Sequence, residues 1–518
     1  MKNDSVLHHY RNEKMMKLSA LLHPIPIASS SLKEDPEIYA VCYSSKDVVP
    51  GSLFVAIKGL QSDGYEYISD ALRKGAVAVL AEKPYPSHTL VTENTRKALP
   101  EISARFYEDP SQKITLIGVV GTNGKTTTTY LLESILEAAG YNVGVIGTIN
   151  YRYNDNAYGN PMTTPESTDV QRILMQMYEQ GVTHAIMEVS SHSIDLHRVD
   201  ACAFDVGIFT NFTQDHLDYH QTMDAYWHAK ETFFTTILAE SSKENRTAVI
   251  NANDPKGKVL SEKTHIPYLF TGMDPAYDIF IKIEDHTING ITGCLFNGNE
   301  KIQIHSSLCG DFNIENISSA AGGARALQVS MDAVQKGIAA LKGVPGRLEK
   351  VENNSNRYVF VDYAHTPDAL KHALETLRNV SDRRLICVFG CGGNRDTQKR
   401  PLMGNISTKL ADITIITTDN PRSEDPASIL RDIEKGIDSH IPKWETKKEI
   451  DLSTHGYMVI ADRKKAIQTA IQIATETDVV LIVGKGHENY QILGDRTIYF
   501  DDYTEAKNAL ANGEGNDE

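Results

Sequence analysis

The chain has 518 residues, which is too long for a single hydrophobic core and predicts about three domains. Its formal net charge of -16 argues against nonspecific nucleic-acid binding, because that interaction depends on clustered Lys and Arg. Its apolar runs are shorter than a membrane span, and its six cysteines lack disulfide or zinc spacing, so we expect a cytoplasmic protein, taken to be a monomer, without membrane insertion.

The first 110 residues contain short helical and strand patterns. Residues 1–15 are polar and charged, and because a helical pattern begins at Met16, we expect them to form a flexible extension. Residues 52–57 predict a strand, and residues 71–80 predict the end of a helix followed by a strand. These patterns predict a small N-terminal α/β domain over residues 1–110.

A larger domain is predicted over residues 111–345. An apolar strand at residues 114–120 runs into a Gly-rich turn, and helical apolar spacing follows from Tyr130. Further buried strands are predicted at residues 184–189, 206–210 and 247–250. Strands that alternate with helices favour a mostly parallel sheet. Residues 343–347, which Gly and Pro punctuate, are the expected hinge at the end of this domain.

The remaining chain predicts a third domain over residues 346–518. Residues 357–362, 384–389, 413–417 and 479–483 are expected strands interleaved with helices, a pattern typical of a Rossmann-like domain. The last residues, 511–518, are Gly-rich and acidic and are expected to form a flexible tail. The fold class is therefore α/β with three domains, the central one having a P-loop-type sheet.

The Gly-rich turn of the central domain predicts a triphosphate cradle. Residues 121–126 read Gly-Thr-Asn-Gly-Lys-Thr, and the two glycines let backbone N–H groups approach phosphate oxygens at a helix N-terminus. Lys125 is expected to reach the β- and γ-phosphates of ATP, and Thr126 to hold Mg²⁺. Val119 stands where the usual motif has its leading Gly, which argues against an ordinary GTPase or motor ATPase.

A second cluster is expected near the cradle. Glu188 lies at the end of a predicted strand, and residues 211–218 begin where the next strand ends. Both should lie at the carboxyl edge of the sheet, where open α/β folds bind ligands, so the Glu188 carboxylate and a neutral His216 could hold Mg²⁺ there. Either residue alone is more often an ordinary buried side chain, but their joint position favours a functional role.

Several segments, in order along the chain, resemble one protein family. They are residues 121–126, Thr-Thr-Pro-Glu at 163–166, Met-Glu-Val-Ser-Ser-His at 187–192, residues 211–220, Tyr-Trp-His-Ala-Lys at 226–230, Asn313, Asn316, and Gly-Arg at 346–347. Together they resemble the Mur ligases, the ATP-dependent amide-forming enzymes of bacterial cell-wall precursor synthesis. The resemblance spans nearly the whole chain.

Four segments of the third domain resemble the family member that adds the third peptide residue. They are Asp-Tyr-Ala-His-Thr-Pro-Asp at 362–368, Gly-Cys-Gly-Gly-Asn-Arg-Asp at 390–396, Asp-Asn-Pro-Arg at 419–422 and Gly-Lys-Gly-His-Glu at 484–488. The resemblance implies that the chain joins UDP-N-acetylmuramoyl-L-Ala-D-Glu to a diamino acid. The implied reaction activates the γ-carboxylate as an acyl phosphate, from which the amine displaces phosphate.

The resemblance also implies residues that act on ATP and metal. Lys125, His216 and Lys230 are expected to be catalytic, with Lys230 carbamylated by CO₂ so that it becomes an anion. Thr126, Glu188, His216 and carbamylated Lys230 are expected to hold Mg²⁺. The residues expected to bind ATP are Gly121, Thr122, Asn123, Gly124, Lys125, Thr126, Thr127, Asn313, Arg347, Asp362 and His365.

Contacts to the UDP-dipeptide are implied at residues of the first two domains. The matching residues are Ser45, Thr163, Thr164, Ser190 and Arg198. Ser44 and Lys46 stand where the family usually has Asp and Arg, and Leu196 replaces a Gln found in some members. The hydrogen bonds beside Ser45 are therefore expected to differ from the usual pattern.

The incoming amino acid is expected to contact the third domain. The matching residues are Arg395, Asp419, Asn420, Pro421, Arg422, Gly484 and Glu488. Arg422 offers a bidentate fork for the distal carboxylate that meso-diaminopimelate has and lysine lacks, and Glu488 suits the distal ammonium. These residues favour meso-diaminopimelate, with L-lysine as the alternative.

Two other functions are open. A related ligase adds glutamate to folates and would retain the cradle and the modified lysine, but residues 419–422 and 484–488 together argue against it. A nucleotide-binding regulator without turnover is the second, and the presence of Lys125, Glu188, His216 and Lys230 argues against that.

Overall fold

The computed structural model describes residues 15–59, 62–355, 357–450 and 454–513. The chain forms two compact units: residues 1–281, 296–300 and 315–337 make the first, and residues 282–295, 301–314 and 338–518 make the second. The predicted domain boundaries at residues 110 and 345 stay predictions. Among the described residues, no helix is long and apolar enough to cross a membrane.

The N-terminal part of the first unit contains a five-stranded sheet in the order β2-β7-β6-β5-β4. Its strands β4 to β7 run parallel, and β2 is antiparallel to β7. The strands are β2 Ser29–Ser30, β4 Ala40–Cys42, β5 Ser52–Val55, β6 Ala76–Ala81 and β7 Thr89–Val91, with helices α1 Leu18–Leu22, α2 Ile68–Arg73 and α3 Thr95–Phe106. This arrangement confirms the expected small α/β region.

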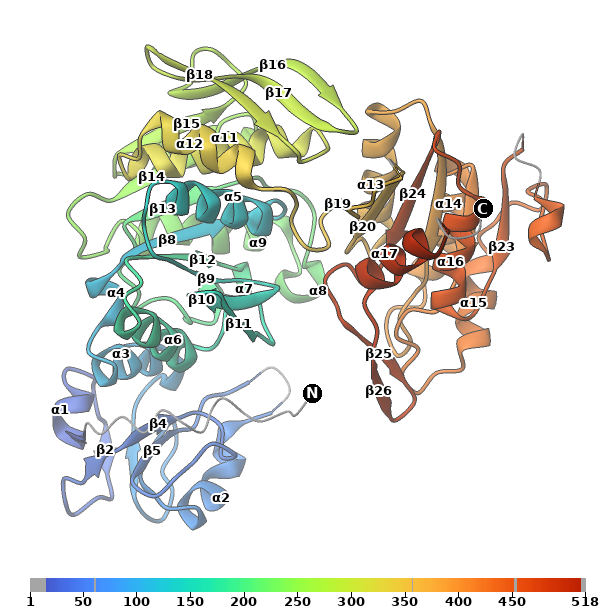
Figure 1. The fold of residues 1–518 in the computed structure, drawn as a ribbon. Helices are drawn as coiled ribbons and strands as arrows, with labels where there is room; N and C mark the ends of the chain where they lie inside the picture. The colour runs from blue at the N-terminus through green and yellow to red at the C-terminus, as the bar shows by residue number, and fades with distance from the viewer. Residues whose placement is uncertain (1–14, 60–61, 356, 451–453, 514–518) are drawn as a thin grey trace. The chain divides into compact units, whose positions relative to one another are not determined.

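The central sheet has the order β11-β10-β9-β12-β8-β13-β14-β15-β16-β17-β18 (Figure 1). Neighbouring strands from β9 to β16 run parallel, whereas β10 is antiparallel to both β9 and β11. The strands are β8 Thr115–Val120, β9 Val143–Ile146, β10 Asn150–Tyr153, β11 Asn156–Gly159, β12 His184–Glu188, β13 Val206–Phe209, β14 Thr247–Asn251, β15 Tyr268–Gly272, β16 Ile279–Thr287, β17 Gly290–Asn297 and β18 Glu300–Ser306. The mostly parallel sheet is thus confirmed.

Several helices of this region connect the parallel strands, and α11 Phe312–Ala326 and α12 Met331–Ala340 follow the last strand. The other helices are α4 Pro110–Lys113, α5 Lys125–Ala138, α6 Ser167–Glu179, α7 Ser191–Asp195, α8 Leu217–His220, α9 Met223–Thr232 and α10 Pro255–Lys263. The inner strands β8, β9 and β13 are buried and rich in Val and Ile, as expected for a sheet that helices cover on both faces. Phe204, Phe209, Phe233 and Phe234 fill the core beside it, and each is fully buried.

The second unit has a six-stranded sheet in the order β19-β20-β24-β21-β22-β23, parallel except for β19. Its strands are β19 Glu349–Lys350, β20 Tyr358–Asp362, β21 Arg384–Phe389, β22 Ile413–Ile416, β23 Gly456–Val459 and β24 Asp478–Val483. Helices α13 Pro367–Asn379, α14 Lys399–Leu410 and α15 Pro426–Glu434 pack on one face, and α16 Arg463–Ile473 and α17 Asp502–Gly513 on the other. This is the doubly wound arrangement predicted for a Rossmann-like domain.

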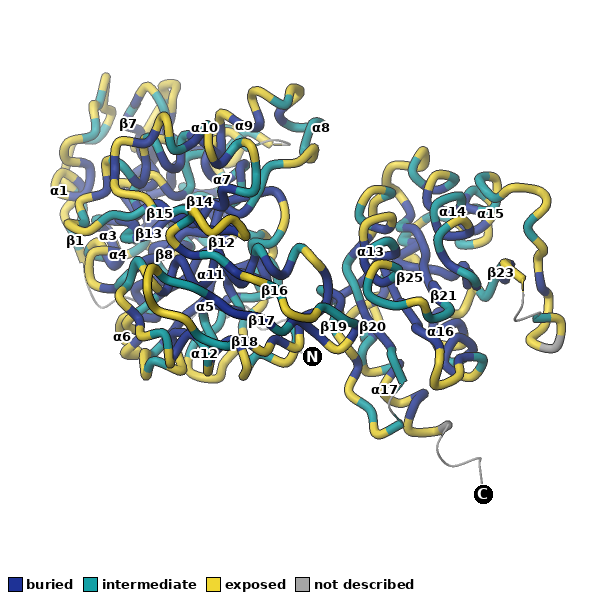
Figure 2. Tube along the Cα trace, turned by 90° about the horizontal axis from the view of Figure 1, so that it is seen from above, coloured by how far each residue is buried: buried dark blue, intermediate teal, exposed yellow. Residues whose placement is uncertain are grey.

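Burial follows this layering in both units. In Figure 2 the inner strands of the large sheets are mostly buried, and exposed residues lie in loops, on the outer sides of helices and on edge strands such as β11 and β18. The hairpin of β25 Tyr490–Leu493 and β26 Arg496–Tyr499 is an exception, since Leu493, Ile498 and Tyr499 are exposed apolar residues.

Two local predictions differ from the structure. Met16 and Lys17 form strand β1, which pairs with β3 Glu37–Ile38, so the first helix begins at Leu18. Helix α5 begins at Lys125, directly after the Gly-rich turn, as the phosphate cradle requires. The expected tail begins later, since α17 continues to Gly513. Residues 1–14 and 514–518, expected to be flexible, lie outside the described residues.

Candidate active site

The cradle connects β8 to α5 and leaves no room for larger side chains. Gly124 has a φ of +83°, and a Cβ on it would lie 2.2 Å from Asn316 Oδ1. A Cβ on Gly121 would lie 1.8 Å from Thr210 Oγ1. The backbone N–H groups of Thr122 and Asn123 donate to Asn211, 2.9 Å from its carbonyl oxygen and Oδ1 respectively. Neighbouring side chains therefore hold the Gly-rich turn in one shape.

The side chain of Lys125 folds back over the cradle. Its Nζ donates to the carbonyl oxygens of Gly121 and Thr122, both at 2.9 Å. Thr127 is buried in the first turn of α5. The ammonium thus lies above the turn where phosphate oxygens would bind, as expected for a helix that begins at this residue.

Glu188, at the end of β12, accepts hydrogen bonds from three directions. Thr126 Oγ1 donates to its Oε2 at 3.0 Å, and the Thr148 hydroxyl donates to the same oxygen at 2.9 Å. The Thr148 backbone N–H donates to Oε1 at 2.9 Å. The residue is 1% exposed. A carboxylate and a hydroxyl are hard oxygen ligands, so this pair fits the donor set that Mg²⁺ prefers.

Thr148 had not been singled out by sequence, although it connects two predicted sites. Its hydroxyl lies 3.1 Å from that of Thr163, which is expected to contact the UDP-dipeptide. A lone threonine after a strand carries no motif, so only the fold shows that β9 and β12 bring it to Glu188.

Lys230 is buried below the cradle on α9, with 2% of its surface exposed. Its Nζ donates to the Gly121 carbonyl at 2.7 Å and lies 4.5 Å from the centre of the Tyr226 ring. Burial lowers the pKa of Lys230 well below its ordinary value, and the nearby Lys125 ammonium lowers it further. Both causes favour the neutral amine over the ammonium.

His216 lies just before α8 with a left-handed backbone, φ +53°. Burial lowers its pKa, and the Asp215 carboxylate opposes that shift. Its ring is 4.8 Å from the ring of His192, whose pKa burial lowers to about 4. In the described part of the chain, no three His, Cys, Asp or Glu side chains form a metal-binding group. A site here would therefore need Thr126 and a modified Lys230 as well.

The residues expected to hold the dipeptide gather at the end of β12. Thr164 Oγ1 donates to the Glu188 carbonyl at 2.8 Å, and the Ser190 N–H donates to Thr164 Oγ1 at 3.1 Å. Arg198 Nη1 donates to the Thr164 carbonyl at 3.1 Å. Ser45 is also buried but lies in the N-terminal sheet region, where Lys74 Nζ donates to its carbonyl at 2.8 Å.

The residues expected to bind ATP belong to both units. Asn313, in the second unit, donates from Nδ2 to the Cys309 carbonyl at 2.7 Å. Asp362 accepts from the N–H groups of Leu348 and Ala364 at 2.7 and 2.8 Å. Burial raises the pKa of Asp362, and Arg347 opposes the shift. That these residues share one nucleotide with the cradle stays a prediction.

His365 and Arg347 surround the next residue, Tyr363. The Arg347 guanidinium lies 5.2 Å from the centre of the Tyr363 ring. His365 Nδ1 lies 3.0 Å from the Tyr363 carbonyl oxygen, and burial lowers the pKa of its ring. A neutral imidazole beside an aromatic ring and a guanidinium is suited to a planar nucleotide group.

The residues expected to bind diaminopimelate meet at the carboxyl edge of the second sheet. Arg422 Nη1 donates to the Gly393 carbonyl at 2.8 Å, and Asn420 Nδ2 donates to Glu488 Oε2 at 2.9 Å. A Cβ on Gly484, whose φ is +117°, would lie 2.9 Å from Asp419 Oδ2. Gly393 also packs under Pro421, whose carbonyl oxygen would be 2.0 Å from an added Cβ. Arg395 is exposed beside them.

Lys485 is a further residue of this cluster. It is fully buried, and its Nζ donates to Glu488 Oε2 at 3.2 Å. The carboxylate expected to meet the distal ammonium therefore already faces one ammonium. Lys485 lies inside the segment at 484–488, so its position was available from the sequence, but its contact with Glu488 was not.

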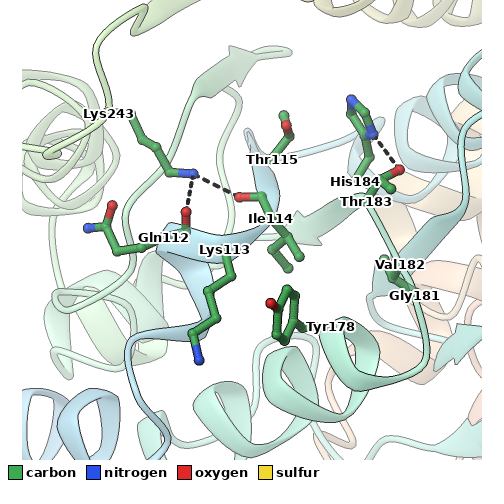
Figure 3. A pocket seen from close by; sticks show the side chains of 10 residues that line it. All are labelled: Gln112, Lys113, Ile114, Thr115, Tyr178, Gly181, Val182, Thr183, His184 and Lys243. Carbon is green, nitrogen blue, oxygen red and sulfur yellow. Dashed lines mark hydrogen bonds between the residues drawn. The ribbon is translucent and has the colours of Figure 1, made fainter.

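A separate cavity of about 440 Å³ lies at the opposite edge of the central strands (Figure 3). It lies where β8 and β12 begin, and Lys243 Nζ donates to the Ile114 carbonyl there at 2.8 Å. Its lining contains none of the residues predicted to act on ATP or substrate. The residues predicted to act on ATP or substrate therefore lie away from this cavity.

Comparison with known proteins identifies the class of protein. Three domain profiles match: "Mur ligase family, catalytic domain" at residues 37–107, "Mur ligase middle domain" at 119–324, and "Mur ligase, glutamate ligase domain" at 346–486. The chain belongs to the Mur ligase family, as the resemblance predicted, and is an ATP-dependent ligase.

Individual relatives carry a more particular name. A protein of Geobacter metallireducens named UDP-N-acetylmuramoyl-L-alanyl-D-glutamate–2,6-diaminopimelate ligase is 41% identical over 96% of this chain and 98% of its own. A solved structure of a ligase with that name has a TM-score of 0.69 and 30% identity, covering 97% of this chain and all of that one. A MurF ligase of Thermotoga maritima, solved with ADP, shares the fold with a TM-score of 0.60 and 20% identity, covering 92% and 97% of the two chains.

Proposed function

We propose that this chain joins meso-diaminopimelate to UDP-N-acetylmuramoyl-L-Ala-D-Glu at the expense of ATP. The observation that carries the choice of amino acid is the convergence of residues 419–422 and 484–488 at one sheet edge. A guanidinium and a carboxylate at that edge suit a diamino acid with a second carboxylate. The names of the full-length relatives favour the same substrate over L-lysine.

The first chemical step joins two anions. A carboxylate oxygen of the UDP-dipeptide attacks the γ-phosphorus of ATP, the bond to the β-phosphate oxygen breaks, and ADP leaves with its electron pair. Lys125 would exchange the two carbonyl oxygens it now contacts for phosphate oxygens, which carry full negative charge. Its role is to position and stabilise the transferring group.

Thr126 and Glu188 would hold Mg²⁺, with His216 as a further donor. Bound Mg²⁺ neutralises charge on the phosphates and screens the approaching carboxylate. The protein's own part is to fix the carboxylate, and the three hydrogen bonds from Thr126 and Thr148 do so. A neutral His216 is consistent with this role, because its pKa is lowered.

Lys230 would be carbamylated. Its neutral amine attacks CO₂, a nitrogen–carbon bond forms as one carbon–oxygen π bond of CO₂ becomes a carboxylate oxygen, and one proton leaves the nitrogen, so that the neutral side chain becomes an anion. The lowered pKa of Lys230 supports this step because only the unprotonated amine is nucleophilic. The ordinary alternative, a buried ammonium bonded to the Gly121 carbonyl, would leave two positive charges beside the metal position.

The second step forms the amide. The amine nitrogen of the amino acid attacks the acyl carbon, the carbon–oxygen bond to phosphate breaks, and the nitrogen loses a proton. Arg422 would bind the distal carboxylate of the amino acid. Glu488, which Lys485 contacts, would orient its distal ammonium.

The remaining predicted contacts belong to the same proposal. Ser45, Thr163, Thr164, Ser190 and Arg198 would bind the UDP-dipeptide, and their convergence near Glu188 supports the last four. Asn313, Arg347, Asp362 and His365 would complete the nucleotide site. The monomeric state and the cytoplasmic location stay predictions. Light scattering tests the monomeric state.

The decisive experiment supplies ATP, Mg²⁺ and the UDP-dipeptide with meso-diaminopimelate and L-lysine in competition, followed by product mass. We expect ADP release that depends on both other substrates and a product that contains diaminopimelate. A product that contains mainly lysine would reassign the amino acid. Glutamate addition to a folate would favour the folate ligase, and no turnover would favour a nucleotide-binding regulator.

A further inference from the structure

A buried ion pair lies directly behind the predicted amino-acid site. Arg463 is the first residue of α16 and Asp502 the first residue of α17, and both side chains are fully buried. Arg463 Nε donates to Asp502 Oδ1 at 2.8 Å, and Nη2 donates to Oδ2 at 2.6 Å. The two groups therefore form a side-on bidentate pair, the arrangement that best fixes the plane of a guanidinium.

The same guanidinium also contacts the backbone that leads into the amino-acid site. Its Nη2 donates to the carbonyl of Val483, the last residue of β24, at 2.9 Å, and Nη1 reaches the carbonyl of Thr418 at 3.4 Å. Gly484 follows the first carbonyl, and Asp419 follows the second. One side chain thus joins the starting points of both predicted binding segments.

Stability alone gives little reason for an arginine at this position. A cation at the first residue of a helix is unfavourable beside the helix dipole, and a buried ion pair often adds no net stability over apolar residues. Burial opposes the charge on Arg463, yet its pKa is raised because Asp502 and, more weakly, Asp419 and Glu488 favour the cation. The carboxylates of the predicted site, Asp419 and Glu488, therefore stabilise the charged form of this guanidinium.

We infer that Arg463, held by Asp502, is a positioning residue that sets the spacing between residues 419–422 and 484–488 and thereby the affinity for diaminopimelate. The inference rests on the proposed function. Arg463 itself does not line the site; it acts through the carbonyls of Val483 and Thr418. A small shift of either segment would misplace Arg422 relative to Glu488, and such misplacements are costly for binding and rate.

The structure provides a matched control in the same sheet. Arg384 begins β21 and Asp478 begins β24, and Arg384 Nη2 lies 2.5 Å from Asp478 Oδ2. This second Arg–Asp pair therefore lies at the other end of β24, away from residues 419–422 and 484–488. Arg384→Lys should perturb the sheet without moving the amino-acid site.

The test compares Arg463→Lys with Arg384→Lys, measuring KM for all three substrates, kcat and the melting temperature. Lysine keeps the charge but cannot make the bidentate pair and both carbonyl contacts together. We expect Arg463→Lys to raise KM for diaminopimelate roughly tenfold or more, with KM for ATP and the UDP-dipeptide within about twofold. Arg384→Lys should leave all three KM values within about twofold, even if it melts earlier.

Three results would overturn the inference. Arg463→Lys could change all three KM values equally, or it could lower kcat alone. Arg384→Lys could also raise KM for diaminopimelate without raising the other two KM values. If Arg463→Lys does not fold, Asp502→Asn is measured by the same criteria, since it keeps the side-chain shape while removing the charge that holds Arg463. Failure of the proposed function is distinguishable, because the wild-type protein would then not use diaminopimelate at all.

Discussion

The cradle of the first unit and the amino-acid site of the second hold their charges in different ways. Around the cradle, Lys125 and Lys230 both donate to the carbonyl oxygen of Gly121. In the second unit, Lys485 contacts the carboxylate of Glu488, and a buried Arg–Asp pair lies behind the binding segments. The first arrangement pairs both lysines with a neutral acceptor. In the second, Lys485 and Arg463 are paired with anions, although Arg422 donates to the neutral carbonyl oxygen of Gly393.

This difference matches the ligands expected at the two sites. A cation on a neutral carbonyl is easily transferred to an incoming polyanion, because little electrostatic energy is lost. A small zwitterion instead needs binding groups at fixed distances, which charge pairs already formed in the protein provide. Variants at the first site should therefore affect turnover with every amino acid, and variants at the second should affect the choice of amino acid.

The largest effect is expected for Lys230→Ala. It should lower kcat by at least about a hundredfold for any amino acid while ATP still binds, because the anion proposed to support Mg²⁺ is lost. A short carboxylate such as formate should restore part of the activity, since the alanine leaves space below Gly121. Steady-state rates and ATP titration measure both effects.

Two controls sharpen this result. Lys230→Arg should stay inactive with formate, because guanidinium is not carbamylated and fills the space. Lys243→Ala removes a lysine at the other edge of the same sheet and should keep its turnover. Labelled bicarbonate followed by NMR detects the carbamate directly. Full activity in the alanine variant would remove the carbamate from the mechanism.

Arg422→Ala should break the amino-acid site selectively. Losing a charge-assisted bidentate contact costs on the order of 1.5 to 3 kcal/mol, so kcat/KM for meso-diaminopimelate should fall by about 10- to 150-fold. Use of lysine, which lacks the distal carboxylate, should change little. Measuring kcat/KM for both amino acids reports this discrimination. Equal losses for both, or a wild type that prefers lysine, would contradict the assignment.

Thr148→Val should have a smaller effect at the first site. The substitution keeps the backbone N–H bond to Glu188 but removes the hydroxyl that reaches both Glu188 and Thr163. A hydrogen bond to a charged group contributes about 1.5 kcal/mol or more, so the Mg²⁺ concentration for half-maximal rate should rise severalfold. Thr408→Val, which removes a buried hydroxyl in α14, is the control. An unchanged Mg²⁺ requirement would exclude this role.

The smallest effect concerns stability only. Burial lowers the pKa of His184, at the cavity of Figure 3, to about 4, whereas its ordinary value is 6.5. The unfolded chain therefore binds a proton that the folded one does not, so the stability from His184 is present above pH 6.5 and is lost as pH falls towards 4. Urea unfolding measured between pH 6.5 and 4 should show that the free energy of unfolding falls less steeply with acid in His184→Gln than in the wild type. Parallel curves for both proteins would contradict this.

Sequence patterns located the buried strands well. β8, β12, β13 and β21 are apolar runs followed by polar or Gly-rich segments, and such runs have few alternatives in an α/β chain. The hairpins β10–β11 and β25–β26 were missed because they are short, partly exposed and mixed in polarity. Met16 and Lys17 were misassigned, since pairing with β3 outweighs a two-residue helical pattern.

Candidate site residues could be named from the sequence only where a motif marked them. Lys125, Glu188 and Arg422 lie in such segments; the structure places Thr126 beside Glu188 and Asn420 beside Glu488, and the roles of these residues stay predictions. Thr148 and Arg463 belong to no motif, and their roles depend on which strand ends meet in space. Side chains that act on other side chains or on the backbone leave little trace in a single sequence.

The backbone conformation of Arg422 is strained, and this strain affects which substitutions evolution would favour at this position. Its φ of +54° is a left-handed conformation that Gly or Asn adopts more readily, and for arginine the strain is about 1 kcal/mol. Arg422→Gly should therefore relax the turn, raising the melting temperature while weakening selectivity for diaminopimelate. Selection for heat resistance and selection for a correct cell-wall peptide would thus oppose each other at this one position.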